Sequence, residues 1–421
     1  MVLALSGGSL GAAASVNAAD RSIEAAFTAE SYAPGDAASL KLFSNATTLS
    51  VQIFHAGSER IHTRRLDLMN GTPVGRSRII GSRNAGATVG IAVGRWPSGL
   101  YFARLASSNG SLGFAPFIVR PIRLGEHRTA VVLPTQTWQA YNFRDDNGDG
   151  KADTWYAGNG DTARLARPFL HRGVPPRFRH YDLPFLHWLS WTGKRADYLA
   201  DADLRAIASG GALARHYDLL VFEGHHEYVT THEYDVVQRY RDLGGNLMFL
   251  FADDFDWRIV VQDNVMTRID RWRNLSRPQA ALIGAQYRAS DRGARKAPWV
   301  VAATDDFSWL FRGTGFHRGS RFGSGGIELD ATAPSSPAGV RVPARISNLF
   351  GPTYTGEMTY YETARGAKVF AAGAFDLVES ILEPDKPPPD AGARANQTGA
   401  RRMLENLWTQ LSTPGAQAPR R

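Results

Sequence analysis

The clearest pattern of apolar and polar positions lies in residues 217–257. Apolar runs at Leu219–Phe222 and Leu247–Phe251 are each followed at once by polar and acidic residues. Between the runs, Thr230 with Glu233 three residues later is typical of a helix N-terminus, because each side chain can bond the other's main-chain N–H. The pattern therefore predicts a strand, a helix and a second strand, which is a crossover unit with parallel strands.

Ionisable side chains follow both predicted strands. His225, His226 and Glu227 come after the first strand, and Asp253 and Asp254 after the second. The carboxyl ends of parallel strands meet at one edge of a sheet, and ligands bind beyond that edge. We therefore expect a functional site here; the alternative interpretation is that these are solvated loop residues.

The chain before this unit has a different texture. Short apolar segments between residues 23 and 121 are separated by turn sequences such as Pro34-Gly35-Asp36 and Asn70-Gly71. Regularly spaced short strands of this kind predict an immunoglobulin-like β-sandwich over residues 21–122. None of its residues has catalytic spacing, so we interpret it as an accessory or interaction domain.

The remainder, residues 123–413, predicts an α/β domain. Ala130–Leu133 and Lys368–Ala372 form buried apolar runs, and Asp182 precedes an apolar helix. Helices that alternate with buried strands predict a flavodoxin-like or class I glutamine amidotransferase-like fold. Residues 291–363 are rich in Gly, Ser, Pro and Arg, and there we expect long loops over the active edge of the sheet. A length of 421 residues also favours two domains.

Composition excludes several classes of function. The chain has no cysteine, which rules out thiol nucleophiles, disulfides and cysteine-bound metals, and with them the cysteine mechanism of the amidotransferases. No G-x-S-x-G sequence follows a predicted strand, so a serine hydrolase has no support. The net charge is +8, but the arginines are scattered, and we expect no nucleic-acid partner. No apolar run is long enough for a membrane span; a homo-oligomer is compatible with the sequence.

The two ends of the chain lie outside these domains. Residues 1–20 are rich in Ala, Leu, Gly and Ser and contain Val16-Asn17-Ala18, which is typical of a cleavage site, although no positive n-region precedes it. We interpret the segment as the remnant of a secretion signal, which predicts a secreted or periplasmic protein; otherwise it is a disordered end and the protein is cytoplasmic. Residues 414–421 are predicted to be a disordered tail.

An acidic loop after the strand at 130–133 has the spacing of a calcium site. Asp145, Asn147, Asp149 and Asp153 match alternate ligand positions of an EF-hand-type loop, with Gly150 at the sharp turn. Tyr156 stands where the twelfth position needs a bidentate glutamate. The sequence thus leaves open either a bound calcium ion or a solvated turn.

Several motifs in order resemble one family. These are TWQAYN, Trp155-Tyr156, DLPFLHWLSWTG, EGHHEY, GGNLMFLFADDFDWR and YYETARGAKVFAAGAF. Over Thr129 to Leu411 the chain resembles the large (beta) subunit of N,N-dimethylformamidase and its relatives, including the β-sandwich that precedes the domain. The family usually has Asn at the positions of Asp253 and Asp254, and HDEYW where this chain has HHEYV.

The resemblance implies a mononuclear iron held by two tyrosine phenolates and a glutamate carboxylate. Carried onto this sequence, the ligands are Tyr141, Tyr156 and Glu227. His225 is implied beside them, and Glu362 is implied as a general base or acid. Asp253, at the end of the second strand, completes the predicted catalytic residues.

Together these expectations give two hypotheses of different classes. The first is an iron-dependent hydrolase of the C–N bond of a small amide, in which the ion activates water and a neighbouring carboxylate or imidazole moves the proton. The second is a secreted binding or surface protein that keeps the fold without activity. Stoichiometric iron would favour the first and a folded, metal-free protein the second.

Overall fold

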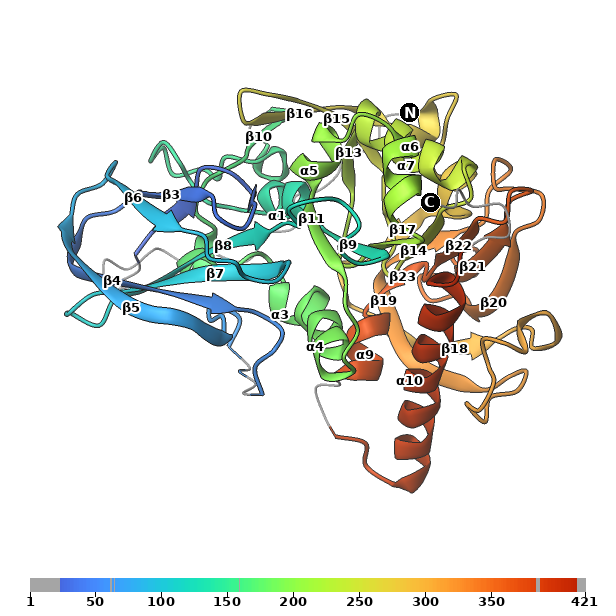
Figure 1. Cartoon of the computed structure of the whole chain (residues 1–421). Coiled ribbons are helices and arrows are strands. Elements are labelled where there is room, and N and C mark those ends of the chain that lie inside the picture. The colour runs from blue at the N-terminus through green and yellow to red at the C-terminus, as the bar shows by residue number, and fades with distance from the viewer. Residues whose placement is uncertain (1–22, 61–62, 64, 159, 384–386, 415–421) are drawn as a thin grey trace.

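The computed structural model describes residues 23–60, 63, 65–158, 160–383 and 387–414 (Figure 1). The predicted secretion signal lies outside these ranges, as does nearly all of the predicted tail. None of the helices within the described ranges is both long and apolar enough to cross a membrane.

The first hundred described residues form two facing sheets with one shared core. Apolar side chains alternate with polar ones along these strands, as in β3, and the apolar ones meet between the sheets. One sheet has the order β1 (Ala25–Phe27), β3 (Ala37–Leu42), β6 (Thr88–Ala92). The other has the order β2 (Ser31–Tyr32), β8 (Leu112–Val119), β7 (Gly99–Ala106), β4 (Ala46–His55), β5 (Thr72–Arg83).

An eleven-stranded mixed sheet dominates the rest of the chain. Its first five strands are parallel neighbours. They are β11 (Asp197–Ala200), β9 (Thr129–Leu133), β12 (Leu219–Phe222), β14 (Asn246–Phe249) and β22 (Lys368–Ala371). Their side chains are buried on both faces, which explains why they are short continuous apolar runs.

Antiparallel strands continue the same sheet beyond β22. They are β21 (Gly356–Glu362), β20 (Arg341–Ile346), β18 (Lys296–Val301), β19 (Arg321–Ala331) and β17 (Gln286–Ser290), with β23 (Ala374–Phe375) paired to β19. The predicted flavodoxin-like or amidotransferase-like domain is therefore wrong. Such a fold needs helical crossovers between parallel neighbouring strands, whereas the neighbours in this half are antiparallel. The region 291–363, where long loops were expected, contains four of its strands, β18, β19, β20 and β21.

A separate four-stranded sheet lies beside the eleven-stranded sheet. Its order is β10 (Thr162–Arg164), β16 (Val265–Arg271), β15 (Trp257–Gln262), β13 (Tyr228–Thr230). Because β13 directly follows the polar residues 225–227 and pairs with β15, both ends of that segment are held by sheets.

Helices cover both faces of the parallel strands (Figure 1). On one face lie α5 (Asp201–Ala206), α6 (Gly210–His216) and α7 (Thr231–Asp242). On the other lie α4 (Leu183–Trp191), α9 (Leu377–Leu382) and α10 (Ala391–Leu411), together with part of the five-stranded sheet. The shorter helices are α1 (Thr135–Ala140), α2 (Leu170–Gly173), α3 (Phe178–Tyr181) and α8 (Gln279–Ile283).

The predicted crossover unit is confirmed. Strands β12 and β14 are parallel neighbours and α7 connects them. Thr230 Oγ1 accepts from the Glu233 N–H at 3.2 Å, and the Glu233 carboxylate accepts from the Thr230 N–H at 2.5 Å. This reciprocal cap satisfies two main-chain donors that the first turn would otherwise leave unpaired.

A buried histidine joins helix α4 to two distant segments. His187 bonds the carboxylate of Glu383 through Nδ1 and that of Glu59 through Nε2, the latter at 3.1 Å. Burial lowers the pKa of His187, but the two carboxylates outweigh burial and raise the pKa to about 9. Since the folded-state pKa exceeds the usual 6.5, the contact stabilises the fold fully below about pH 6.5, and this stability is lost as pH rises through about 9.

We therefore expect His187→Gln to lower the free energy of unfolding by a pH-dependent amount. This amount should decrease by on the order of 3 kcal/mol between pH 6.5 and 9.5. Urea unfolding of the wild type and the variant at several pH values measures it. The difference between the two proteins should shrink as pH rises, and a constant difference would contradict the assignment.

Candidate metal centre

The site begins at the carboxyl ends of β9 and β12. The chain passes from β9 to β11 on one side and then to β12 on the other, and a sheet opens a crevice where its strand order reverses in this way. Helix α1 follows β9 and ends at Tyr141, while residues 225–227 follow β12. The topology thus brings Tyr141 next to Glu227.

Two phenols converge on the Glu227 carboxylate. Tyr141 Oη donates to Glu227 Oε2 at 2.7 Å, and Tyr156 Oη lies 3.0 Å from Oε2 and 3.2 Å from Oε1. The two tyrosine rings stack with centroids 4.5 Å apart. The structure therefore brings together all three of the predicted ligands, including Tyr156 from the short helix Trp155–Ala157.

The position of Glu227 is held by its own main chain. The Glu227 N–H donates to Thr137 Oγ1 at 3.1 Å, and its carbonyl accepts from the Trp257 N–H at 2.9 Å. Burial raises the pKa of Glu227, and it also raises the pKa values of Tyr141 and Tyr156, with the Glu227 charge adding to the effect on both phenols. Without a cation the phenols are therefore neutral donors to one buried carboxylate.

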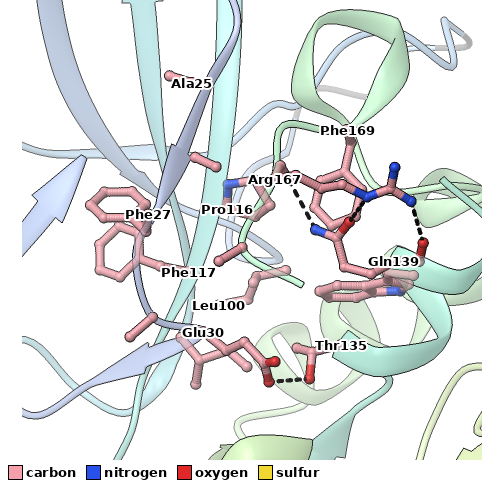
Figure 2. A pocket seen from close by; sticks show the side chains of 15 residues that line it. Ala25, Phe27, Glu30, Leu100, Pro116, Phe117, Thr135, Gln139, Arg167 and Phe169 are labelled. Atoms are coloured by element: carbon pink, nitrogen blue, oxygen red, sulfur yellow. Dashed lines mark hydrogen bonds between the residues drawn. The ribbon is translucent and has the colours of Figure 1, made fainter. Parts of the chain in front are cut away.

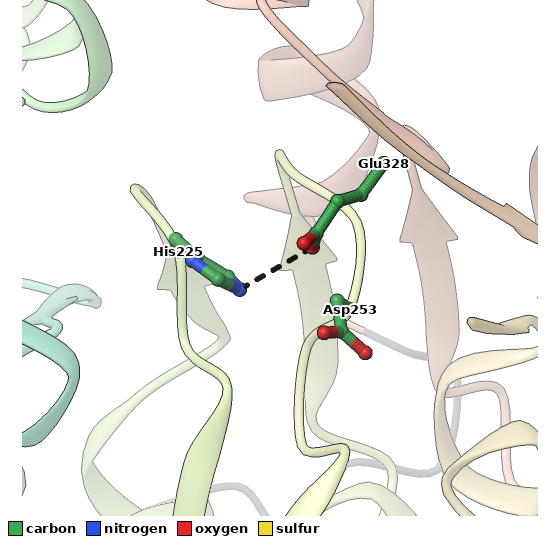
Figure 3. Close-up of side chains that lie close together, drawn as sticks. All are labelled: His225, Asp253 and Glu328. Carbon is green, nitrogen blue, oxygen red and sulfur yellow. Dashed lines mark ion pairs between the residues drawn. The ribbon is translucent and has the colours of Figure 1, made fainter. Parts of the chain in front are cut away.

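A second set of side chains, His225, Asp253 and Glu328, lies close together (Figure 3). His225 Nε2 lies 3.6 Å from Glu227 Oε2 and 3.8 Å from Glu328 Oε2. One ligand atom each from His225, Asp253 and Glu328 lies within 4.8 Å of the others, and the same holds for Glu227, Asp253 and Asp256. Sequence reasoning found His225 and Asp253 but missed Glu328, which lies on β19 in the region expected to be loop.

The acidic side chains of these two groups differ in whether a basic residue balances their charge. Asp256 pairs with Arg273 and Arg271. Among the described residues, no lysine or arginine forms an ion pair with Asp253 or Glu328. Burial and the neighbouring carboxylates raise the pKa of both groups well above the usual range. The pKa of His225 falls to about 3 because its imidazole is buried, so the ring is neutral near pH 7.

His226, by contrast, is a structural residue. Its Nε2 lies 2.8 Å from the Glu223 carbonyl oxygen and 3.1 Å from that of Val132, and its N–H donates to Asp254 at 2.9 Å. These contacts tie the loop after β12 to β9 and to the loop after β14. The imidazole is thereby directed away from Glu227, while that of its neighbour His225 faces it.

The structure does not bring Glu362 to the site. Glu362 is exposed at the end of β21 and lies opposite Lys368, the first residue of β22. Lys368 in turn bonds Asn246, the first residue of β14. Glu362 is therefore at the amino-terminal edge of the parallel strands, opposite the site, and it accepts a hydrogen bond from Tyr360 Oη at 2.6 Å. This position does not support the expected role as general base.

The predicted calcium loop satisfies its oxygens internally. Asp145 accepts from the N–H groups of Asn147, Gly148 and Gly150. The Asn147 and Asp149 side chains each accept from an N–H two residues later, and Asp153 accepts from the Asp146 N–H. The carboxylate groups close enough for a metal, among the described residues, are those around Asp253 and not this loop. Calcium binding stays a prediction.

Arg167 orders the segment between the two tyrosines. Its buried guanidinium donates to the carbonyl oxygens of Gln139, Asn142 and Arg144 at 3.0, 2.9 and 3.2 Å and pairs with Asp146 at 3.1 Å. The guanidinium thus balances the charge of Asp146, which is not one of the predicted calcium ligands. No sequence signal points to Arg167, since a single arginine after a predicted loop resembles any solvated one.

The N-terminal sheets also hold α1. Glu30 accepts from Thr135 Oγ1 at 2.6 Å (Figure 2). It also accepts from the Ala202 N–H at 3.2 Å, which fixes the first turn of α1 against α5. Since α1 ends at Tyr141, this contact connects the sandwich to the site. It acts with Asp201, whose carboxylate accepts from the Gln136 N–H at 2.8 Å.

Comparison with known proteins defines the class. The profile of the family "N,N-dimethylformamidase beta subunit-like, C-terminal" matches residues 87–387, well over half of the chain, so the chain belongs to this family. No curated protein matches it.

Solved structures add only distant likenesses. A superoxide reductase (neelaredoxin) from Ignicoccus hospitalis is 13% identical over 24% of this chain and 77% of its own, with a TM-score of 0.16. A Paenibacillus sp. cycloisomaltooligosaccharide glucanotransferase is 11% identical over 42% of this chain and 27% of its own, with a TM-score of 0.15. Scores this low support no inference about fold or function.

Proposed function

We propose that the protein is a metal-dependent hydrolase of the C–N bond of small amides and that its metal is iron. The observation that carries the proposal is the convergence of the Tyr141 and Tyr156 phenols on the Glu227 carboxylate within 3.2 Å. Three hard, anionic oxygens suit Fe(III) and leave positions for water and substrate. A cation bound there supplies a Lewis acid that polarises an amide carbonyl and acidifies water.

The chain's own groups handle the proton. Glu328 and Asp253 supply carboxylates beside His225, whose Nε2 lies 3.6 Å from Glu227 Oε2. In hydrolysis, water gives its oxygen to the acyl carbon and one proton to a carboxylate, and that proton then passes to the amide nitrogen as the C–N bond breaks. The products are a carboxylic acid and an amine. Glu328 takes the role that the resemblance had implied for Glu362.

Access to the site favours small substrates. Tyr156 is 36% exposed, Phe143 beside it is 46% exposed, and Tyr141, Glu227 and His225 lie deeper. We expect a substrate to enter past these two partly exposed aromatic rings and to meet the polar oxygens afterwards. This order suits an amide with small apolar substituents on nitrogen.

Metal analysis with an amine-release assay tests the proposal. We expect about one iron per chain, a tyrosinate-to-iron charge-transfer band, and amine release from small N-substituted amides such as N,N-dimethylformamide. A folded protein without iron that releases no amine would instead support a non-catalytic binding protein.

Calcium is tested separately at the loop from Asp145 to Asp153. We expect calorimetry at millimolar calcium to detect one site, because alternate oxygens of such a loop can turn to a common centre. Asp149→Ala should abolish the signal, whereas Asp161→Ala, at an exposed aspartate paired with Arg268, should keep it. No heat of binding at millimolar calcium in the wild type would remove the assignment.

A further inference from the structure

We infer that His225, Asp253 and Glu328 form a second cation site, separate from the three oxygens of Tyr141, Tyr156 and Glu227, and that a divalent ion of the zinc type binds there. The three side chains come from different elements: the loop after β12, the loop after β14, and strand β19. All three aim one ligand atom at a common space (Figure 3).

Unsatisfied atoms are the first observation behind this site. His225 Nε2, Asp253 Oδ1 and Glu328 Oε2 are each buried without a hydrogen-bond partner. His225 and Asp253 are only 6% and 5% exposed. A buried polar atom without a partner costs about 1–3 kcal/mol, so one cation bound among the three would remove this cost for all of them.

Charge is the second observation. Asp253 and Glu328 place two carboxylates next to the His225 imidazole, and the ion pairs of the described residues give them neither a lysine nor an arginine. Their neighbour Asp256 differs, because Arg271 and Arg273 balance it. A divalent cation would neutralise both carboxylates and accept the imidazole lone pair at once.

Geometry selects the type of ion. Zinc binds one histidine and two carboxylates at about 2.0–2.2 Å, which places ligand atoms about 3.3–3.6 Å apart in a tetrahedron. The distance from His225 Nε2 to Glu328 Oε2 is already 3.8 Å. Three protein ligands leave the fourth position open, and a nitrogen donor favours zinc over calcium or magnesium.

Occupation of this site would regulate the proposed reaction. The carboxylates that accept the proton in the hydrolase would then be ligands and could no longer accept it, so excess zinc would inhibit turnover. This consequence rests on the proposed function, whereas the binding itself does not.

Calorimetry with zinc alone, on the full iron-loaded chain, tests the binding. We expect one equivalent of zinc to bind with iron retained, and the melting temperature to rise. His225→Ala and Glu328→Gln should each weaken zinc binding on the order of 100-fold, because each removes one of three ligands. Asp253→Asn provides a third, nearly isosteric variant if either of these fails to fold. Glu362→Gln is the matched control and should bind zinc as the wild type does.

Two outcomes would overturn the inference. They are the absence of zinc binding up to millimolar concentration, and zinc binding that survives in both ligand variants. Iron content and the charge-transfer band are measured on the same samples. Zinc binding without iron would therefore contradict the proposed function alone, and iron without zinc would contradict this inference alone.

Discussion

The Glu227→Ala protein is expected to purify with little or no iron. Glu227 is the residue on which both phenols converge, so its removal leaves Tyr141 and Tyr156 without the carboxylate between them. Loss of one anionic ligand from three should weaken iron binding on the order of 100-fold or more. Metal analysis and the visible charge-transfer band measure the loss, and amine release should fall with it.

Tyr228→Phe serves as the matched control. The Tyr228 hydroxyl contacts Tyr156 Oη and accepts from Trp155 Nε1 at 3.2 Å, so it belongs to the same buried group without being a proposed ligand. This variant should keep its iron. If Glu227→Ala retains full iron with an unchanged band, the ion is bound elsewhere, and Tyr141, Tyr156 and Glu227 are not its three ligands.

Much of the site could be predicted because its residues follow strands. The runs at 130–133, 219–222 and 247–251 are short, apolar and bounded, which is typical of parallel strands buried on both faces. Their carboxyl ends must share one edge. Tyr141, His225, Glu227 and Asp253 were therefore predictable as neighbours before any contact was known.

Glu328 could not be found in this way. It lies on β19, whose sequence RFGSGGIELDA resembles a loop because of its glycines. Two of these glycines are packing requirements: a Cβ on Gly325 would lie 2.6 Å from Ile346 Cδ1, and one on Gly326 would lie 2.5 Å from the Arg295 carbonyl oxygen. The glycines therefore suggested a flexible loop. In the structure they are present because neighbouring strands pack closely against them.

The same segment explains why the predicted fold class was wrong. Antiparallel neighbours need only turns between them, and turns leave no helical periodicity to count. The pairing partners of β19 lie at both lower and higher sequence numbers, so no local pattern shows that it extends the parallel sheet. A parallel unit can be recognised within one short stretch of sequence, whereas this half of the sheet cannot.

Glu328→Gln is expected to keep iron and lose turnover. The amide preserves the volume of the side chain but accepts no proton, and proton transfer by a positioned side chain contributes about 10²–10⁴-fold in rate. The charge-transfer band should survive, because Tyr141, Tyr156 and Glu227 are untouched. The loss should appear in kcat with little change in KM, since the amide still occupies the same space.

Glu362→Gln makes the same chemical change at the opposite edge of the sheet and should turn over amide at the wild-type rate. Comparison of Glu328→Gln with Glu362→Gln separates the role of Glu328 in catalysis from any general effect of losing a carboxylate. Glu328→Asp, which keeps the acid on a shorter side chain, should recover part of the rate. If instead Glu362→Gln loses turnover and Glu328→Gln does not, the proton passes through the exposed end of β21. His225 and Asp253 would then take no part in moving the proton. The residues around Glu227 would only bind the ion.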